Sequence, residues 1–195
     1  MTTISQNQVI KTLTRFIVMV LAVTAITLPI DQYSKKMARD NYLIAEDAGD
    51  SRIYQGRRHE VVALGNDGYN LLLQWTYVRN HGASYGVMNA VSEAMRIPAL
   101  VAISLFFAVL MTIAGYHSLK SGRIALAWSV AGLIGGSVGN FVDRVQQGYV
   151  TDLIALRGRM GGASFWVMPV FNVADLVIVF ALILAVSQII FDQKN

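Results

Sequence analysis

The stretch Phe171–Phe191, FNVADLVIVFALILAVSQIIF, decides the fold. Its length matches the roughly 20 apolar residues that an α-helix needs to cross a bilayer at a rise of about 1.5 Å per residue. Asp175 is the fifth residue of this run. An ionisable side chain inside a membrane span costs several kcal/mol unless it has a partner or faces a wet cavity. The stretch therefore predicts a membrane-spanning helix that carries a functional carboxylate.

The composition of the whole chain fits an integral membrane protein. Of its 195 residues, 54% are hydrophobic and only 14% are charged, whereas soluble domains contain about 25% charged residues. A signal peptide, with Lys11 and Arg15 as its basic region, is the alternative for the short first apolar stretch. We expect one membrane-embedded domain, residues 1–195, with spans at about 14–30, 97–116, 124–142 and 167–191.

Charge and residue usage exclude several classes of function. The net charge of +4 is modest and dispersed along the chain, so we expect contacts with membrane lipids and none with nucleic acid. The chain has no cysteine, which removes thiol nucleophiles, thiolate metal sites and disulfides. Its three histidines, His59, His81 and His117, form no His-Glu-x-x-His motif. We therefore expect neither a metal nor another cofactor.

The basic residues predict the orientation in the membrane. Lys11 and Arg15 precede the first span, and Lys120 and Arg123 lie in the short connection between the second and third spans. Both termini should then face the cytoplasm, and the loops 31–96 and 143–166 should face outward. With this topology, polar residues of three spans converge on the outer membrane surface: Asp31, Asn140, Asp143, Asn172 and Asp175.

The long outer loop is expected to be partly structured. Leu71–Val78 predicts a β-strand, and Gly65–Gly68 before it predicts a turn. Asn89–Met95 predicts a short interfacial helix ahead of Pro98, whereas we expect residues 41–70 to form a loop.

Small residues in the third span predict close helix packing. Gly132, Gly135, Gly136 and Gly139 form two small-xxx-small pairs. Such pairs let a second helix approach the backbone closely, and packing explains them without any further role.

Asp152 and Asp175 are the candidate catalytic pair. Asp152 lies in Tyr149–Ile154, just before the last span, among β-branched and apolar neighbours. Two carboxylates that share a site do not both ionise easily, so one stays protonated while the other removes a proton from water. That water would attack an amide carbonyl, and the acid would assist the departing amine. A structural charge paired with Arg144 is the alternative for Asp175.

Four further polar residues suit a supporting role: Asn140, Asp143, Arg144 and Asn172. Asparagines at membrane depth usually form hydrogen bonds across helices, and here they would orient the carboxylates or bind the substrate backbone. An Asp143–Arg144 pair is also explained as the anchor of a helix end.

Lys35 and Lys36 follow the first span and fit a helix end whose cations reach toward the membrane surface. A catalytic serine–lysine pair with Ser34 or Ser84 is conceivable. Adjacent residues of a helix do not face each other, so Ser34 with Lys35 is disfavoured.

Five ordered motifs run along the chain: Asp31-Gln-x-x-Lys35, Asn80-x-Gly82-Ala83, Gly139-Asn140-x-x-Asp143-Arg144, Gly148-x-Val150-x-Asp152 and Phe171-Asn172-x-Ala174-Asp175. Together they resemble the motifs of bacterial lipoprotein signal peptidase, also called signal peptidase II, an aspartic membrane peptidase. The resemblance covers nearly the whole chain. It implies that Asp152 and Asp175 are catalytic. It places the supporting or substrate-binding residues at Asp31, Lys35, Asn80, Gly82, Asn140, Asp143, Arg144, Asn172 and Ala174.

The same resemblance implies a fold and a reaction. The fold would be an all-α integral membrane protein of four transmembrane helices, with a small extracytoplasmic β-strand cradle and a short interfacial helix. The substrate would be a diacylglyceryl-modified prolipoprotein, cut just before the lipidated cysteine in the bacterial inner membrane. The family is inhibited by the cyclic peptide globomycin. We expect the enzyme to act as a monomer.

A proton-coupled transporter or channel is the competing prediction, because intramembrane acids also serve as proton relays. Transporters, however, place polar groups near the bilayer midplane and often contain inverted repeats. Here the polar residues gather toward one surface, and no internal repeat is evident. A non-catalytic assembly or lipid-binding protein is a third reading, and it would not require these acids and asparagines to converge.

Overall fold

The computed structural model describes residues 6–42, 59–66, 69–82, 91–160 and 163–192. These residues divide into two compact units. The first, which we call the helical unit, comprises Met1–Ile30, Ala102–Phe141 and Ala174–Asn195. The second, which we call the sheet unit, comprises Asp31–Val101 and Val142–Val173. The expectation of a single domain over the whole chain stays a prediction.

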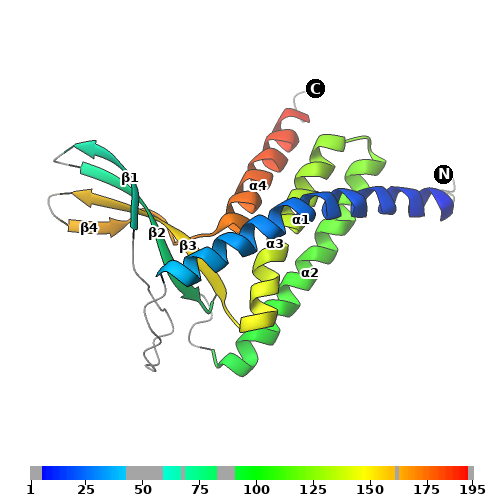
Figure 1. The fold of residues 1–195 in the computed structure, drawn as a ribbon. Coiled ribbons are helices and arrows are strands. Elements are labelled where there is room, and N and C mark those ends of the chain that lie inside the picture. Colours follow the sequence, from blue (N-terminus) through cyan, green and yellow to red (C-terminus); the bar gives the residue numbers. More distant parts are fainter. Residues whose placement is uncertain (1–5, 43–58, 67–68, 83–90, 161–162, 193–195) are drawn as a thin grey trace. The chain divides into compact units, whose positions relative to one another are not determined.

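Four helices, α1 (Gln6–Tyr42), α2 (Glu93–Lys120), α3 (Ile124–Gln147) and α4 (Val173–Asp192), are long and apolar enough to cross a membrane (Figure 1). The expectation of four transmembrane helices is thereby confirmed. α1 continues past the expected end at residue 30 because Asp31–Tyr42 contains neither glycine nor proline to stop a helix. α4 begins at Val173, six residues after the expected start at 167.

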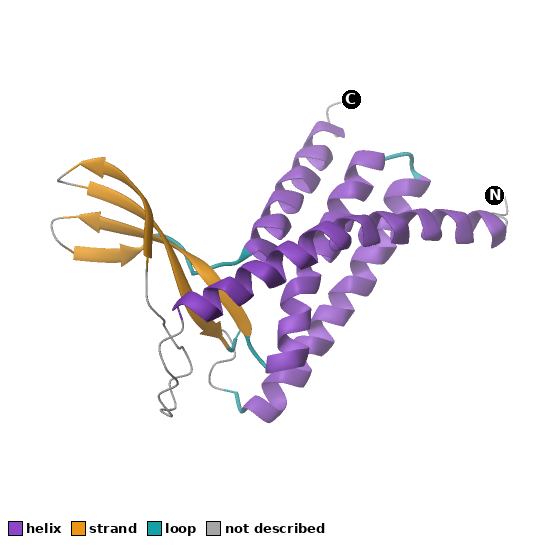
Figure 2. Ribbon diagram, in the orientation of Figure 1, coloured by secondary structure: helices purple, strands orange, loops and turns teal. Residues whose placement is uncertain are grey.

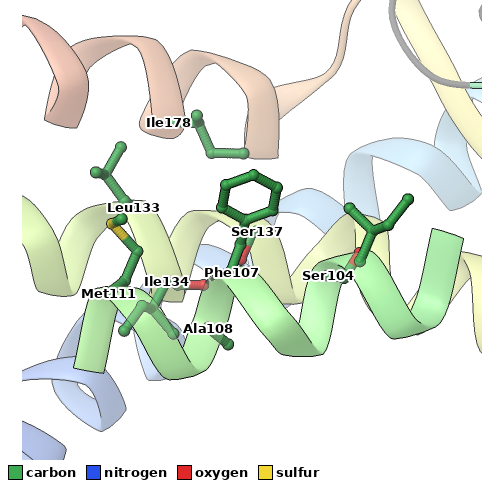
Figure 3. Close-up of a pocket in the computed structure, with 9 residues that line it drawn as sticks. Ser104, Phe107, Ala108, Met111, Leu133, Ile134, Ser137 and Ile178 are labelled. Atoms are coloured by element: carbon green, nitrogen blue, oxygen red, sulfur yellow. Dashed lines mark hydrogen bonds between the residues drawn. The ribbon is translucent and has the colours of Figure 1, made fainter. Parts of the chain in front are cut away.

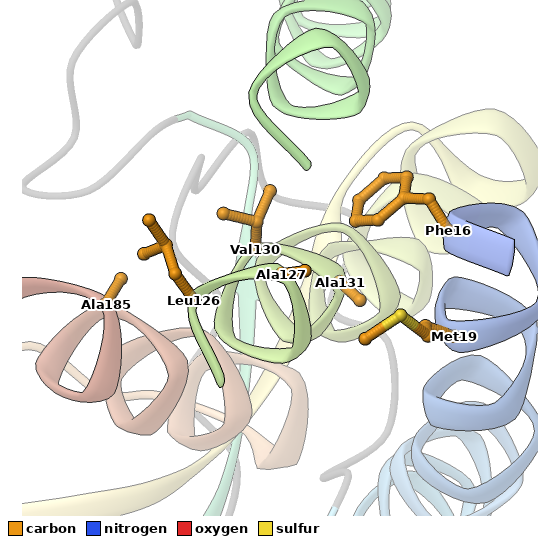
Figure 4. Packing of buried hydrophobic residues seen from close by; sticks show 7 residues of the cluster. All are labelled: Phe16, Met19, Leu126, Ala127, Val130, Ala131 and Ala185. Atoms are coloured by element: carbon orange, nitrogen blue, oxygen red, sulfur yellow. The ribbon is translucent and has the colours of Figure 1, made fainter. Parts of the chain in front are cut away.

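α3 is the central helix of the helical unit. In its most apolar window 56% of the residues are buried, against 11%, 6% and 17% in α1, α2 and α4. The apolar side chains that the other helices expose are suited to lipid. Figure 4 shows α3 between α1 and α4, with a buried cluster of Phe16, Met19, Leu126, Ala127, Val130, Ala131 and Ala185.

The glycines of α3 bring neighbouring helices close, as predicted. A Cβ added at Gly135 would lie 2.8 Å from Cγ1 of Val23 on α1, and one added at Gly132 would lie 2.9 Å from Cβ of Ala181 on α4. The short approach also lets Thr27 Oγ1 donate a hydrogen bond to the Gly135 carbonyl at 3.2 Å. Small residues and interhelical hydrogen bonds are the usual means of packing helices in lipid.

The strands β1 (His59–Asn66), β2 (Tyr69–Asn80), β3 (Val150–Met160) and β4 (Ala163–Trp166) form one antiparallel sheet in the order β1-β2-β3-β4 (Figure 2). β2 contains Leu71–Val78, which confirms the predicted strand. The prediction of a loop over 41–70 is wrong for 59–66, because pairing with β2 makes a strand of this segment. The connection 143–166 likewise contains two strands rather than loop alone.

Among the described residues, the segment expected to form a short helix over Asn89–Met95 is not a separate helix. Glu93–Met95 forms the first turn of α2, and the carbonyl of Ser92 accepts hydrogen bonds from the amides of Met95 and Arg96. Asn89 and Ala90 lie outside the described residues.

The sheet unit has its own core, which holds β3 in place. Ala38 of α1, Tyr77 of β2 and Leu153 of β3 are each at most 1% exposed and pack together. Tyr42, Trp75 and Ile154 surround them. The C-terminal turns of α1 therefore anchor the part of β3 that carries Asp152.

Candidate active site

Asp152 is buried and receives a hydrogen bond on each carboxylate oxygen. It lies opposite Val78 in the β2–β3 ladder and is 2% exposed. Asn172 Nδ2 donates to Oδ1 at 2.9 Å, and Asn80 Nδ2 donates to Oδ2 at 2.9 Å. A carboxylate accepts hydrogen bonds at both oxygens, so two amide donors from separate segments hold its plane in one orientation.

Both asparagines are themselves fixed. The Asn80 amide oxygen accepts a hydrogen bond from the backbone N–H of Gly82 at 3.1 Å, the local turn typical of asparagine. This turn explains why Asn80 and Gly82 lie two positions apart in their motif. Gly82 is itself buried. Asn172 is fully buried, and its Nδ2 also lies 3.3 Å from the Thr151 carbonyl oxygen.

Asp175 lies in the helical unit, in the first turn of α4. Its Oδ1 accepts a hydrogen bond from Nδ2 of Asn140 on α3 at 2.8 Å. The helix dipole also favours a carboxylate at this position. Ala174 beside it is 1% exposed. Since Asn172 directly precedes α4, the residue that holds Asp152 lies only three positions before Asp175 in the chain.

A buried ion cluster lies in the sheet unit. Lys35 Nζ lies 2.7 Å from Oδ2 of Asp31 and 3.0 Å from Oδ2 of Asp143, and all three side chains are at most 4% exposed. Asp31 and Lys35 meet because they are one turn apart on α1. The prediction that Lys35 reaches the membrane surface is therefore wrong, because two buried carboxylates retain it. Asp143 likewise makes its ion pair with Lys35 rather than with the neighbouring Arg144.

Two residues that the motif analysis left without a role bind this cluster, and one of them, Thr151, directly precedes Asp152. Gln32 Nε2 donates to Oδ1 of Asp143 at 2.9 Å, and the backbone N–H of Thr151 donates to Oδ2 of Asp143 at 3.0 Å. The sequence could have pointed to both residues, because Gln32 lies between Asp31 and Lys35 in the first motif and Thr151 is adjacent to Asp152. The cluster holds the start of β3, and therefore the residue before Asp152.

Three further candidates remain: Arg144, Ser34 and Ser84. Arg144 is half-buried in the last turn of α3. Ser34 Oγ donates to the Asp31 carbonyl at 2.8 Å, which is a local helix contact rather than a bond to Lys35. Ser84 lies outside the described residues.

Tyr149 lies beside this network, just before β3. Its hydroxyl is 3.3 Å from that of Tyr77, and the Arg79 guanidinium lies 5.2 Å from its ring centre. Partial burial, followed by the hydrogen bond to Tyr77, raises the pKa of Tyr149 to about 12. The phenol therefore stays neutral at physiological pH.

The helical unit also contains an apolar pocket of about 250 Å³ among α2, α3 and α4 (Figure 3). Its lining contains no acidic side chain, and Ser137 in it donates its hydroxyl to the Ile134 carbonyl at 2.7 Å. The candidate carboxylates are therefore not among the residues that line this pocket. Within the ranges that the structure describes, no three histidine or acidic side chains gather as metal ligands would.

Comparison with known proteins assigns this chain with four candidate membrane spans to a family. Residues 12–191 match the family model described as signal peptidase (SPase) II. The chain belongs to the signal peptidase II family. Its spans and its peptidase class follow from that membership, so the chain is a multi-pass membrane peptidase.

Curated signal peptidase II relatives extend over almost the same length. The chain is 31% identical over 170 residues to "Lipoprotein signal peptidase" of Moorella thermoacetica, a match that covers 87% of this chain and 91% of the relative. It is 25% identical over 184 residues to the protein of the same description from Enterococcus faecalis, covering 93% and 94%.

Solved structures of bacterial membrane enzymes share the fold seen here. One bacterial membrane enzyme structure, determined by the in meso method, gives a TM-score of 0.60 at 21% identity, with 90% of each chain covered. A second gives a TM-score of 0.57 at 21% identity, with 87% of this chain and 91% of that chain covered. These likenesses concern the fold of the four helices and the sheet.

Proposed function

We propose that this signal peptidase II family member removes the signal peptide from diacylglyceryl-modified prolipoproteins, cutting just before the lipidated cysteine. Family membership over residues 12–191 and the lipoprotein signal peptidases among its relatives support the substrate class. The transporter alternative finds no support in these matches. The enzyme would lie in the bacterial inner membrane with both termini in the cytoplasm, and it would act as a monomer without a cofactor.

The proposed catalytic groups are the carboxylates of Asp152 and Asp175. The observation that carries this proposal is that each is held by an asparagine from another segment of the chain: Asp152 by Asn172 and Asn80, and Asp175 by Asn140. Oriented hydrogen bonds keep a reacting group in its productive geometry. A carboxylate serving only as a structural charge would more simply pair with a cation, as Asp31 and Asp143 do with Lys35.

In the proposed reaction, one carboxylate is ionised and the other protonated. The ionised carboxylate removes a proton from water as the water oxygen bonds to the scissile carbonyl carbon. The protonated carboxyl donates a hydrogen bond to the developing oxyanion. The C–N bond then breaks, the amine of the lipidated cysteine takes up a proton, and the signal peptide leaves with a new carboxyl terminus.

The supporting residues would act through these two groups. Asn80, Asn140 and Asn172 would orient the carboxylates or bind the substrate backbone. The Lys35 cluster with Asp31 and Asp143 would hold the start of β3, because Asp143 binds the Thr151 amide. Gly82 would fix the Asn80 amide. The remaining candidates, Arg144 and Ala174, would complete the surroundings of the site.

We further propose that the enzyme recognises its substrate by the diacylglyceryl group, so that the rate of cleavage depends on this lipid. Asp175 is the third residue of α4, so a peptide bond reaches it only near the end of a membrane span. The acyl chains hold the substrate in the leaflet, because each buried CH₂ contributes about 0.8 kcal/mol of membrane affinity. This raises the local concentration of the scissile bond and sets its height.

The test compares one precursor with and without its diacylglyceryl group, using the full-length enzyme in nanodiscs. We expect rapid cleavage of the lipidated precursor and strongly reduced cleavage of the unlipidated one. Equal rates would show that the lipid does not select the substrate. Failure to cut either precursor, with the enzyme folded, would contradict the proposed function itself.

A further inference from the structure

Arg96, near the start of α2, is a buried cation that is only 4% exposed. No carboxylate whose side chain the structure describes forms an ion pair with it, and its buried Nε has no hydrogen-bond partner among the described residues. Buried charges in proteins are usually paired, because removing an ion from water costs much free energy. A guanidinium that is retained here without such a pair calls for another role.

The guanidinium has two neutral acceptors, one at each end of the connection between β2 and α2. Arg96 Nη1 donates a hydrogen bond to the Val91 carbonyl at 3.3 Å. Nη2 lies 3.5 Å from Nδ1 of His81, which directly follows the end of β2 at Asn80. An arginine fork reaches two separate acceptors at fixed angles, which a single ammonium group does not. The Arg96 side chain thus joins the end of β2 to the residues ahead of α2.

The contact with Arg96 fixes the protonation state of His81. Arginine has only hydrogen-bond donors, so Nδ1 of the histidine must be the acceptor, and the neutral imidazole carries its proton on Nε2. A proton on Nδ1 would remove this acceptor and place a second positive charge beside the guanidinium. The hydrogen bond between His81 and Arg96 therefore exists only while the histidine is neutral.

Tyr149, just before β3, contacts the His81 ring from a third segment of the chain. The two ring centres lie 5.3 Å apart, and the ring planes are inclined by 47°. The phenol stays neutral in the physiological range because its pKa is about 12. The Arg79 guanidinium of β2 lies 5.2 Å from the centre of the same phenol ring. His81 is thus flanked by Arg96 and Tyr149, with the Arg79 cation beside the tyrosine.

His81 occupies the middle position of the turn that orients Asn80. The backbone N–H of Gly82 donates to the Asn80 amide oxygen at 3.1 Å, and the amide nitrogen of the same side chain donates to Oδ2 of Asp152 at 2.9 Å. The turn spans Asn80–Gly82, so the backbone of His81 connects its two ends. A change in the position of His81 therefore alters the geometry of the hydrogen bond that Asp152 accepts.

We propose that Arg96 and His81 are positioning residues for Asp152, which hold the Asn80 turn in the orientation that cleavage requires. This inference rests on the proposed function, because it concerns the same reaction. The guanidinium retains the imidazole, the imidazole fixes the turn, and the turn directs the Asn80 amide to the carboxylate. Since the imidazole accepts from Arg96 only when it is neutral, the arrangement is lost as the pH falls through the range in which histidine takes up a proton.

The test uses the full-length enzyme in nanodiscs and one lipidated precursor. Arg96→Met removes the donors, and His81→Ala removes the acceptor. His81→Asn places an amide oxygen where Nδ1 lies, and this amide does not titrate. Arg159→Met and His59→Ala, at exposed positions of β3 and β1, are the matched controls. Gel filtration and thermal unfolding give the folded fraction of each variant, so that kcat is expressed per folded enzyme.

We expect Arg96→Met and His81→Ala each to lower kcat about tenfold with little change in KM, since a hydrogen bond to a charged group contributes at least that factor. The double variant should be no slower than either single one, because both changes break the same contact. His81→Asn should restore most of the lost kcat. Its kcat should also decline less than that of the wild type between about pH 7.5 and about pH 5.5, across the ordinary pKa of histidine near 6.5.

Wild-type kcat per folded enzyme in Arg96→Met and His81→Ala would overturn the proposal, because the two residues would then contribute only to folding. Losses that multiply in the double variant, or identical pH profiles of the wild type and His81→Asn, would also overturn it. If Arg96→Met does not fold, equal kcat values for His81→Asn and His81→Ala have the same consequence. A wild-type enzyme that fails to cut the lipidated precursor would instead contradict the proposed function, and this inference would fall with it.

Discussion

Asn172 donates a hydrogen bond from Nδ2 to Oδ1 of Asp152 at 2.9 Å, and it directly precedes the helix α4 that carries Asp175. One short segment of backbone therefore holds one candidate carboxylate by a hydrogen bond and carries the other covalently. The last motif therefore contains Asn172 for a structural reason: this residue binds Asp152, and Asp175 follows it three positions later in the chain.

Replacing either candidate carboxylate by its amide should abolish cleavage. Asp152→Asn and Asp175→Asn keep the side-chain shape but cannot exchange the proton that activates water. The double variant should be no less active than either single one, because the pair acts as a unit. The measurement is cleavage of a lipidated precursor in nanodiscs, with gel filtration and thermal unfolding to show that each variant is folded.

Asp40→Asn is the matched control for the amide variants. Asp40 lies on α1, is 53% exposed and pairs with Lys36 at the surface, so its removal should leave turnover near the wild-type value. Turnover near the wild-type rate by Asp152→Asn or Asp175→Asn would show that this pair does not activate the water.

Loss of the Asn172 amide should lower kcat more than it raises KM. A hydrogen bond to a charged group contributes about 1.5–3 kcal/mol, and each 1.4 kcal/mol is about tenfold in rate, so Asn172→Ala should lose about 10–150-fold. Asn41→Ala, at an exposed position of α1 where the amide binds the Met37 carbonyl, is the control. An increase in KM with unchanged kcat would instead assign Asn172 to binding of the substrate backbone.

Removal of the buried cation should destabilise the protein as a whole. Lys35→Met leaves the buried Asp31 and Asp143 without their shared cation, a change that costs about 3–5 kcal/mol of folding free energy. Lys36→Met removes only a surface pair with Asp40, which is worth about 0–1 kcal/mol. Thermal unfolding in one detergent compares the two variants. Identical midpoints would mean that the cluster contributes no more than a surface pair.

The predicted orientation places the sheet outside and the α2–α3 turn in the cytoplasm. Single cysteines at Ala63 in β1 and at Ser121 in that turn lie at exposed positions of a chain without native cysteine. In intact cells with a permeabilised outer membrane, an impermeant thiol reagent should label Ala63→Cys and spare Ser121→Cys. The reverse labelling would place both termini outside.

Much of the fold was predictable because its signals are local. A membrane span needs an uninterrupted apolar run of sufficient length, and each of the four helices carries that property in its own residues. Asp152 and Asp175 could be selected from the sequence for a similar reason. A carboxylate in or beside a membrane-spanning apolar run costs free energy, so its presence indicates a functional role. β1 was missed because His59–Asn66 becomes a strand through its partner β2 rather than through a strong pattern of its own.

The sequence by itself determined the four spans, the two candidate carboxylates and the asparagines that accompany them. Only the tertiary structure decided that Lys35 is a buried counterion, that Asn172 and Asn80 bind Asp152 while Asn140 binds Asp175, and that β1 pairs with β2. Hydropathy is a property of consecutive residues, whereas these contacts join residues far apart in the chain. Their partners are chosen by helix packing and by strand register, which exist only once the chain has folded.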